Sequence, residues 1–282
     1  MRQRPNFRSQ RGTAIFMALF FVVLVTSLSI TWYLQSRVAV KRTLLTLTAD
    51  QAYSASQGML YFELALLKNT LHKSQTGEAT SWPILIPEKI SPEGTVSYGR
   101  IEDYQARLNI NNLTDANTKA AFIRLLTALD PATNQDSAAQ LAAAVVAWIT
   151  PSNLLTPLMK EMNQSYASYN PAYRAANRPV HIISELRLVK GVSASIFTAL
   201  EPYVCALPPK TAINLKHSSA AVVLAYNLPP QNAPSVVMSE FFLVRTDIVL
   251  KNQHLVLSTL VHIDPENKEN KIDIVWQSRG PV

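Results

Sequence analysis

The sequence is poor in glycine, cysteine and charge, and each shortage excludes a class of protein. Among 282 residues there are 7 glycines and 1 cysteine, and 16% of the residues are charged. The lone Cys205 excludes an internal disulfide framework and a cysteine-based zinc site. The scarcity of glycine leaves no phosphate-binding loop. Since 48% of the residues are hydrophobic and the mean hydropathy is +0.07, the chain is neither disordered nor a collagen-like or coiled-coil repeat.

Acidic residues are absent from positions 1–42, whereas seven Lys and Arg lie there. The rest of the chain carries 19 Lys and Arg against 19 Asp and Glu, so the net charge of +7 belongs to the N-terminus. A nucleic-acid-binding surface needs an excess of basic groups on the body of the protein. We therefore expect no nucleic-acid partner.

The N-terminal region contains a long apolar run. Ala14–Leu34 is a stretch of 21 uncharged, mostly apolar residues, and a helix of that length spans roughly 30 Å, the thickness of the hydrocarbon core of a bilayer. Four arginines precede the run within twelve residues, and basic residues favour the cytoplasmic side of a membrane. This pattern predicts a single-pass protein with a cytoplasmic N-terminus and the bulk of its chain on the other side.

A glycine stands just before this run, at Gly12, and Thr13 follows it. A short basic leader that ends in glycine before an apolar helix resembles the leader of type IV prepilins. The resemblance implies that prepilin peptidase removes residues 1–12, that residues 13–35 form the membrane part of the helix, and that the protein lies in a bacterial inner membrane with its bulk in the periplasm. A secretory signal cleaved near Ser27–Ser29 and an uncleaved signal anchor are the alternatives.

Met17 is the fifth residue counted from Thr13. Most pilins have glutamate at that position, and its carboxylate is thought to pair with the free N-terminal amine of a neighbouring subunit. A carboxylate in an apolar helix costs ~2.5–3.5 kcal/mol without such a partner. Because a subunit at the tip of a filament has no subunit above it, Met17 points to a tip position.

Helical and extended patterns alternate along the rest of the chain. Residues 36–73 are predicted to continue the helix, with apolar side chains at three- and four-residue spacing: Leu44, Leu47, Ala52, Ala55, Met59, Phe62 and Leu66. Strand patterns occur within residues 94–112 and again from Ile213, the clearest being Glu240–Leu250, Gln253–Ile263 and Lys271–Ser278. Residues 113–205 are predicted to be helical, with a long ordered loop over 151–180. This order predicts an α+β fold in which a helical insert separates two parts of one sheet.

Several strings carry a family resemblance. Asp103–Leu113, DYQARLNINNL, is similar to a D-x-x-G-R-F-N-L-N-N-L run. Pro171–Asn177 and Ser184–Val192 are similar to P-P-Y-x-P-A-N and S-E-L-R-L-V-x-G-V, and Tyr203–Pro208 with Ile213–Leu215 to Y-V-T-A-L-P and I-N-V-N-T-A. These runs are typical of the minor pseudopilins of the K class (GspK) of type II secretion systems, which also lack the glutamate of other pilins. The chain therefore resembles that family over nearly its whole length.

The resemblance implies a pilin-like fold, with a long N-terminal helix packed on an antiparallel sheet and a large helical domain inserted between the halves of the sheet. Residues 36–112 then hold the periplasmic helix and the first strands, 113–207 the insert and 208–282 the remaining strands. The implied function is to cap the tip of a periplasmic pseudopilus with other minor pseudopilins, on a shaft of major pseudopilin, and to help start its assembly and the export of folded exoproteins. A minor pilin of a type IV pilus and a signal-anchored periplasmic binding or hydrolytic protein are the other hypotheses.

Six residues of the family strings are singled out as a structural motif: Asn109, Asn111, Asn112, Glu185, Gly191 and Asn214. The first three asparagines are candidate ligands, but we expect their side chains to bond to backbone at a turn between sheet and insert. The turn at Gly191 resembles a hairpin that grips DNA, and the balanced charge of the chain favours a packing role instead.

The sequence offers little for catalysis or metal binding. Its five histidines are scattered, and no Gly-x-Ser-x-Gly elbow is present. Where the K class often has D-W-L-D-A-D, an acidic string suited to calcium, this chain has Ala147–Ser152, AWITPS, and residues 151–171 hold a single carboxylate, Glu161. Calcium takes about six to eight oxygen ligands, usually with several carboxylates. We therefore expect no cofactor, no metal site and no enzymatic activity.

Overall fold

The structure is a computed structural model that describes residues 10–75, 81–130, 133–227, 238–251, 253–264 and 271–280. Its helices in this part of the chain are α1 (Gln10–Gln75), α2 (Ala116–Leu129), α3 (Gln135–Ile149), α4 (Pro157–Gln164), α5 (Ala194–Leu200) and α6 (Ala220–Tyr226). Its strands are β1 (Ile84–Ile90), β2 (Val96–Asp103), β3 (Leu108–Asn109), β4 (Val204–Cys205), β5 (Phe241–Leu250), β6 (Gln253–Ile263) and β7 (Ile272–Arg279). Short 3-10 turns connect several of them, including Ile110–Asn112 and Ile183–Leu188.

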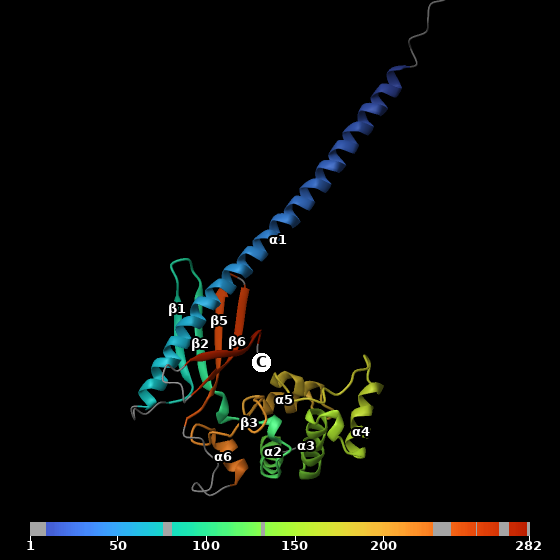
Figure 1. Cartoon of the computed structure of the whole chain (residues 1–282). Coiled ribbons are helices and arrows are strands. Elements are labelled where there is room, and N and C mark those ends of the chain that lie inside the picture. Colours follow the sequence, from blue (N-terminus) through green and yellow to red (C-terminus); the bar gives the residue numbers. More distant parts are fainter. Residues whose placement is uncertain are drawn as a thin grey trace, which may run out of the picture. The chain divides into compact units, whose positions relative to one another are not determined.

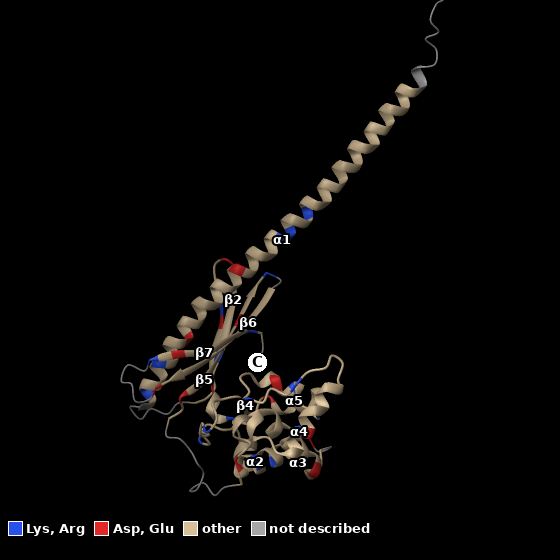
Figure 2. Ribbon diagram, turned by 45° about the vertical axis from the view of Figure 1, so that its right-hand side comes forward, with Lys and Arg blue, Asp and Glu red and all other residues tan. Residues whose placement is uncertain are grey.

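Helix α1 runs for 66 residues, and its residues belong to two compact parts of the chain that divide between Ser54 and Ala55. From Thr13 to Ser36 it carries no charged side chain, and this stretch is tan in Figure 2. The same stretch is exposed, and the mean hydropathy of its most apolar window is 2.4. The helix is therefore long and apolar enough to cross a membrane.

Five antiparallel strands form the main sheet in the order β1-β2-β5-β6-β7. Strands β2 and β5 come from opposite sides of the insert and pair without a break from Val96↔Val249 to Asp103↔Phe242. Residues 55–75 of α1 lie along one face of this sheet (Figure 1) and bury three leucines, which are Leu60, Leu67 and Leu71. Burial of each leucine contributes about 1.5–3 kcal/mol, so this apolar contact holds the helix to the sheet.

The helical insert leaves the sheet and returns to it at neighbouring points. Strands β3 and β4 pair in parallel, with Leu108 opposite Val204 and Asn109 opposite Cys205. Helices α2 to α5 lie between these two strands in the sequence and enclose an apolar core that includes Phe122. The predicted α+β fold, with a helical domain inserted between the halves of an antiparallel sheet, is confirmed.

The helical region extends beyond residue 205, where the sequence pattern places its end. Strands are predicted from Ile213, but the structure has turns there, and α6 follows them. Val222, Ala225 and Tyr226 of α6 join the core of the insert. The composition of the segment AAVVLAY is compatible with a helix or a strand. Packing on α2 and the N-cap at Ser219 stabilise the helix.

Two further elements differ from the sequence prediction. Helix α4 lies in the stretch predicted to be a loop. It begins at Pro157, and the hydroxyl of Thr156 before it caps the first turn. Strand β1 lies just after Pro83, ahead of residues 94–112, where the first strands are predicted. Because β1 is an edge strand of the sheet, Pro87 within it is tolerated.

The buried stripe of α1 is shifted from the predicted one. Phe62 belongs to the predicted apolar stripe but is 56% exposed, whereas its neighbour Glu63 is fully buried. The buried positions between residues 55 and 75 are Ser56, Leu60, Glu63, Leu67 and Leu71. Two of these five are polar, so a pattern built on apolar residues alone selects the adjacent face of the helix.

Candidate functional site

The predicted processing and assembly positions lie at the N-terminal end of α1. Gly12 and Thr13 are both within the helix. The Thr13 and Met17 side chains are exposed, that of Met17 to 66%. Met17 is therefore part of an uncharged surface that lipid or other apolar helices can cover.

Hydroxyl side chains in the apolar stretch bond back to the helix that carries them. Thr26 Oγ1 donates to Val22 O at 2.8 Å, and Ser29 Oγ donates to Val25 O at 2.8 Å. Thr31 Oγ1 does the same to an earlier carbonyl at 2.9 Å. Since these donors are satisfied inside the helix, they do not prevent the stretch from entering hydrocarbon.

Asn109 and Asn111 bond to the backbone that follows β4. Asn109 Nδ2 donates to Pro208 O at 3.0 Å, and its Oδ1 accepts from Leu207 N at 3.1 Å. Asn111 Nδ2 donates to Leu207 O at 2.7 Å and to Val180 O at 2.9 Å. Both side chains thus join the start of the insert to its end.

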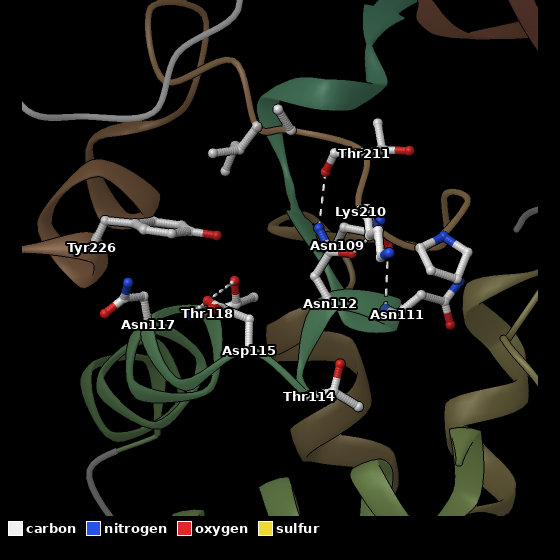
Figure 3. Close-up of a pocket in the computed structure, with 13 residues that line it drawn as sticks. Asn109, Asn111, Asn112, Thr114, Asp115, Asn117, Thr118, Lys210, Thr211 and Tyr226 are labelled. Atoms are coloured by element: carbon white, nitrogen blue, oxygen red, sulfur yellow. Dashed lines mark hydrogen bonds between the residues drawn. The ribbon is translucent and has the colours of Figure 1, made fainter. Parts of the chain in front are cut away.

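Asn112 continues this row at the side of a pocket of about 540 Å³ (Figure 3). Its Nδ2 donates to Thr211 O at 2.8 Å, and its Oδ1 accepts from Lys210 N at 2.7 Å. Across the pocket, burial raises the pKa of Tyr226 to about 12, although a hydrogen bond with Thr118 opposes the rise. The phenol therefore stays neutral, and the pocket lies in the junction between sheet and insert.

Asp103, at the end of β2, gathers donors from three segments. Its Oδ1 accepts from Gln105 N at 3.1 Å. Its Oδ2 lies 2.6 Å from both Ser239 Oγ and His217 Nδ1. Asn214, one of the predicted motif residues, donates to Ser239 Oγ at 2.8 Å. Asn214 is predictable from the family strings, whereas the roles of its neighbours Asp103, His217 and Ser239 are not, although Asp103 opens the first of these strings.

The pair of Asp103 and His217 is not coupled to a nucleophile. Ser218 Oγ donates to Ala106 O at 2.6 Å, and Ser239 Oγ donates to Asp103 rather than to the imidazole. Nucleophilic catalysis by serine requires its hydroxyl to donate to the base. The cluster therefore holds segments together.

Glu185 and Gly191 shape the turns that lead to α5. Glu185 Oε1 accepts from His181 N at 3.1 Å, next to the residue that Asn111 binds. Gly191 has φ +91°, in the left-handed region that favours glycine, and a Cβ there would approach Leu141 Cδ1 to 3.3 Å. Both residues therefore serve packing within the insert.

Side-chain amides hold the segment where the K class often has its acidic string. Asn163 Nδ2 donates to Ala147 O at 3.0 Å. Asn177 donates through its backbone N–H to Trp148 O at 2.8 Å and through Nδ2 to Thr150 O at 3.1 Å. The carbonyl oxygens of residues 147, 148 and 150 thus already accept N–H groups.

Aromatic rings complete this support. Tyr166, Tyr169 and Tyr173 contact one another, and Trp148 contacts Tyr166 and Tyr173 at centroid distances of 5.1 and 6.3 Å. No group of three or more His, Cys, Asp or Glu side chains suited to a metal occurs in the described chain. The residues of this segment do not fit a calcium site.

A groove of about 680 Å³, with apolar side chains on α1 and charged ones on the β1–β2 hairpin, lies between these elements. Its apolar lining includes Ala55, Met59, Phe62, Ile86 and Ile248. Tyr61, which precedes Phe62 in the sequence, is 71% exposed. Exposed apolar side chains gathered around a groove are typical of a surface that binds another protein.

Known proteins are similar to this chain in sequence and in fold. A family model described as "Type II secretion system (T2SS), protein K" matches residues 106–209. Type II secretion system protein K of Klebsiella pneumoniae is 30% identical over 237 residues, which are 79% of this chain and 71% of that protein. The protein of the same name from Pseudomonas aeruginosa is 28% identical over 246 residues, or 82% and 72% of the two chains. A chain in the crystal structure of the GspK-GspI-GspJ complex of the enterotoxigenic Escherichia coli Type 2 Secretion System superposes with a TM-score of 0.66 at 20% identity, covering 83% of this chain and 99% of that one.

Proposed function

Because the chain belongs to the protein K family of type II secretion systems, we propose that it is a minor pseudopilin that caps the tip of a periplasmic pseudopilus and helps start its assembly. The family that the strings indicate is confirmed by these relatives. The observation that carries the tip position is Met17, which leaves the apolar surface of α1 without a carboxylate. In the same proposal, residues 13–35 of α1 anchor the chain in the inner membrane, and residues 36–282 lie in the periplasm.

Processing by prepilin peptidase is tested by the N-terminal mass of the protein extracted from membranes. We expect a chain that begins at Thr13. Gly12→Leu should block this cleavage. Gly58→Leu is a matched control, since Gly58 lies in the same helix with nothing within 4 Å of its Cβ position. An intact Met1 in the native protein, or a start near Ile30, contradicts processing and favours a tethered periplasmic protein.

The role in secretion is tested by deletion of the gene. We expect exoproteins to accumulate in the periplasm and pseudopili to fail to assemble, with both restored by the gene in trans. Unchanged secretion combined with a defect in type IV pili assigns the chain to a pilus instead. Unchanged secretion and unchanged pili contradict a role in either filament.

Other minor pseudopilins are the proposed partners. This is supported by the E. coli neighbour, which was crystallised as GspK with GspI and GspJ. The groove beside Phe62 offers a surface for an apolar helix of such a partner. The major pseudopilin of the shaft and prepilin peptidase complete the set of proposed protein partners.

We also propose that the protein works without a metal, another cofactor or an enzymatic step. Two features support this view: the amides that occupy the carbonyl oxygens near residue 148, and serine hydroxyls that donate away from His217. Its function then lies in assembly alone. Calcium removal, described below, tests the metal part of the proposal.

A further inference from the structure

Glu63 is buried between α1 and the sheet although its side chain ends in a carboxyl group. The residue is 0% exposed. Its Oε2 accepts a hydrogen bond from Thr246 Oγ1 of β5, and its Oε1 has no hydrogen-bond partner in the described chain. An ionised carboxylate with one oxygen unsatisfied is among the most costly groups to bury. The surroundings therefore suit the neutral acid.

Gly99 of β2 leaves the space that this carboxyl fills. It pairs with Thr246 in the sheet. A Cβ at Gly99 would overlap Glu63 Oε1 and lie 2.8 Å from Arg245 O. The backbone of Gly99 is not in the left-handed conformation. Glycine is therefore needed there because a side chain would prevent the close approach of α1 to the sheet. The helix and the sheet are thus fitted to each other around the carboxyl group.

The nearest charged groups do not neutralise Glu63. Successive strand residues point to opposite faces of the sheet, so Arg245 and Asp247 project away from the face that carries Thr246. Asp247 is bound on that far side by Arg245 Nε at 3.1 Å and by His254 Nε2 at 2.9 Å. The Arg245 guanidinium is thereby already paired.

The other ionisable side chains of these elements give Glu63 no bond either. On residues 55–75 of α1 and on strands β1, β2, β6 and β7 they are Tyr61, Lys68, His72, Lys73, Glu88, Lys89, Tyr98, Arg100, Glu102, Asp103, His262, Asp273 and Arg279. None of them forms a hydrogen bond or ion pair with Glu63 in the described part of the chain.

We propose that Glu63 is a pH-sensitive latch, which in its protonated form seats residues 55–75 of α1 on the sheet and on ionisation loosens them. Burial raises the pKa of Glu63 to about 8; the Thr246 hydrogen bond opposes the rise and the charge of Asp247 adds to it. A carboxyl whose pKa is higher in the folded chain than its ordinary 4.5 stabilises the fold fully below pH 4.5. That contribution is lost as the pH rises through about 8.

Thermal unfolding of the full chain in detergent, followed by circular dichroism at pH 6, 7, 8 and 9, tests the latch. Glu63→Gln keeps the shape of the side chain and cannot ionise. We expect the Tm of the wild type, relative to Glu63→Gln, to fall by at least about 3 °C between pH 6 and pH 9. Glu161→Gln on α4 is the matched control, because Glu161 is exposed, and its difference from the wild type should stay constant. A constant difference for Glu63→Gln overturns the proposal.

The wild-type chain provides a second measurement if Glu63→Gln fails to fold. Ordinary carboxyl groups are ionised by pH 6.5, since their pKa values lie near 4. We expect the infrared spectrum at pH 6.5 to contain the band of a protonated carboxyl that disappears as the pH rises through 8. A spectrum without that band at pH 6.5 overturns the latch.

Discussion

The side chain of Asn111 bonds to both backbone groups of Val180. Its Nδ2 donates to Val180 O at 2.9 Å, and its Oδ1 accepts from Val180 N at 2.8 Å. The same Nδ2 also donates to Leu207 O at 2.7 Å. One buried amide thus joins the first turn of the insert, its middle and the chain that follows β4.

Asn111→Ala should destabilise the protein by about 2–4 kcal/mol, because it removes three buried hydrogen bonds and leaves backbone groups unsatisfied. Urea unfolding of the full chain in detergent measures the loss. Asn117→Ala is the control: Asn117 lines the same junction pocket but is exposed, and its change should stay within about 0.5 kcal/mol. Equal effects of the two changes contradict the role given to Asn111.

Met17→Glu should leave secretion close to the wild-type level. At a filament tip no subunit above supplies an amine, and a carboxylate near the end of the apolar stretch is less costly than one at the bilayer centre, where the cost is ~2.5–3.5 kcal/mol. Leu24→Glu, in the middle of the stretch, should impair insertion and secretion. The measurement is the amount of exoprotein in the medium. If Met17→Glu is as harmful as Leu24→Glu, the tip position is contradicted.

Removal of calcium with a chelator should change the Tm of the full chain by less than about 1 °C. The reason is that Asn163 and Asn177 hold the segment near residue 148 without a cation. Asn177→Ala should lower the Tm equally with and without the chelator. A fall in Tm that added calcium reverses contradicts the absence of a structural calcium ion.

Phe62→Lys should weaken association with the other minor pseudopilins by about tenfold or more, since it removes the aromatic ring from the apolar side of the groove and puts a charge there. Co-purification of the full chain from membranes measures it. Leu158→Lys is the control, because Leu158 on α4 is 66% exposed and lies outside the groove. Loss of association in both variants, or in neither, contradicts docking at this groove.

The fold was predictable from the sequence where local pattern and packing agree. The apolar run of α1, the pairing strands near the C-terminus and the helical insert all carry strong periodic signals, and β6 (Gln253–Ile263) has the predicted bounds. Helix α6 and the exposed Phe62 were not predictable, because packing against distant elements decides which side of an apolar segment is buried.

The junction was predictable only in part. The asparagine string indicates side chains that bond to backbone. Their partners and the network of Asp103 cannot be predicted from the neighbouring sequence, since Ser239 lies 136 residues after Asp103. The burial of Glu63 was not predictable for another reason. A pattern of apolar residues does not include a carboxyl group, even one that the fold keeps in the core.

The adjacent positions of β3 and β4 bear on how the chain folds. Pairing of β2 with β5 must close a very long loop, and the entropy lost in closing a loop grows with its length. An insert that folds first brings its own ends together at Leu108 and Val204 and so shortens the loop that remains to be closed. The folded insert then holds the ends of β2 and β5 within reach of each other, and damage to its core should slow formation of the sheet.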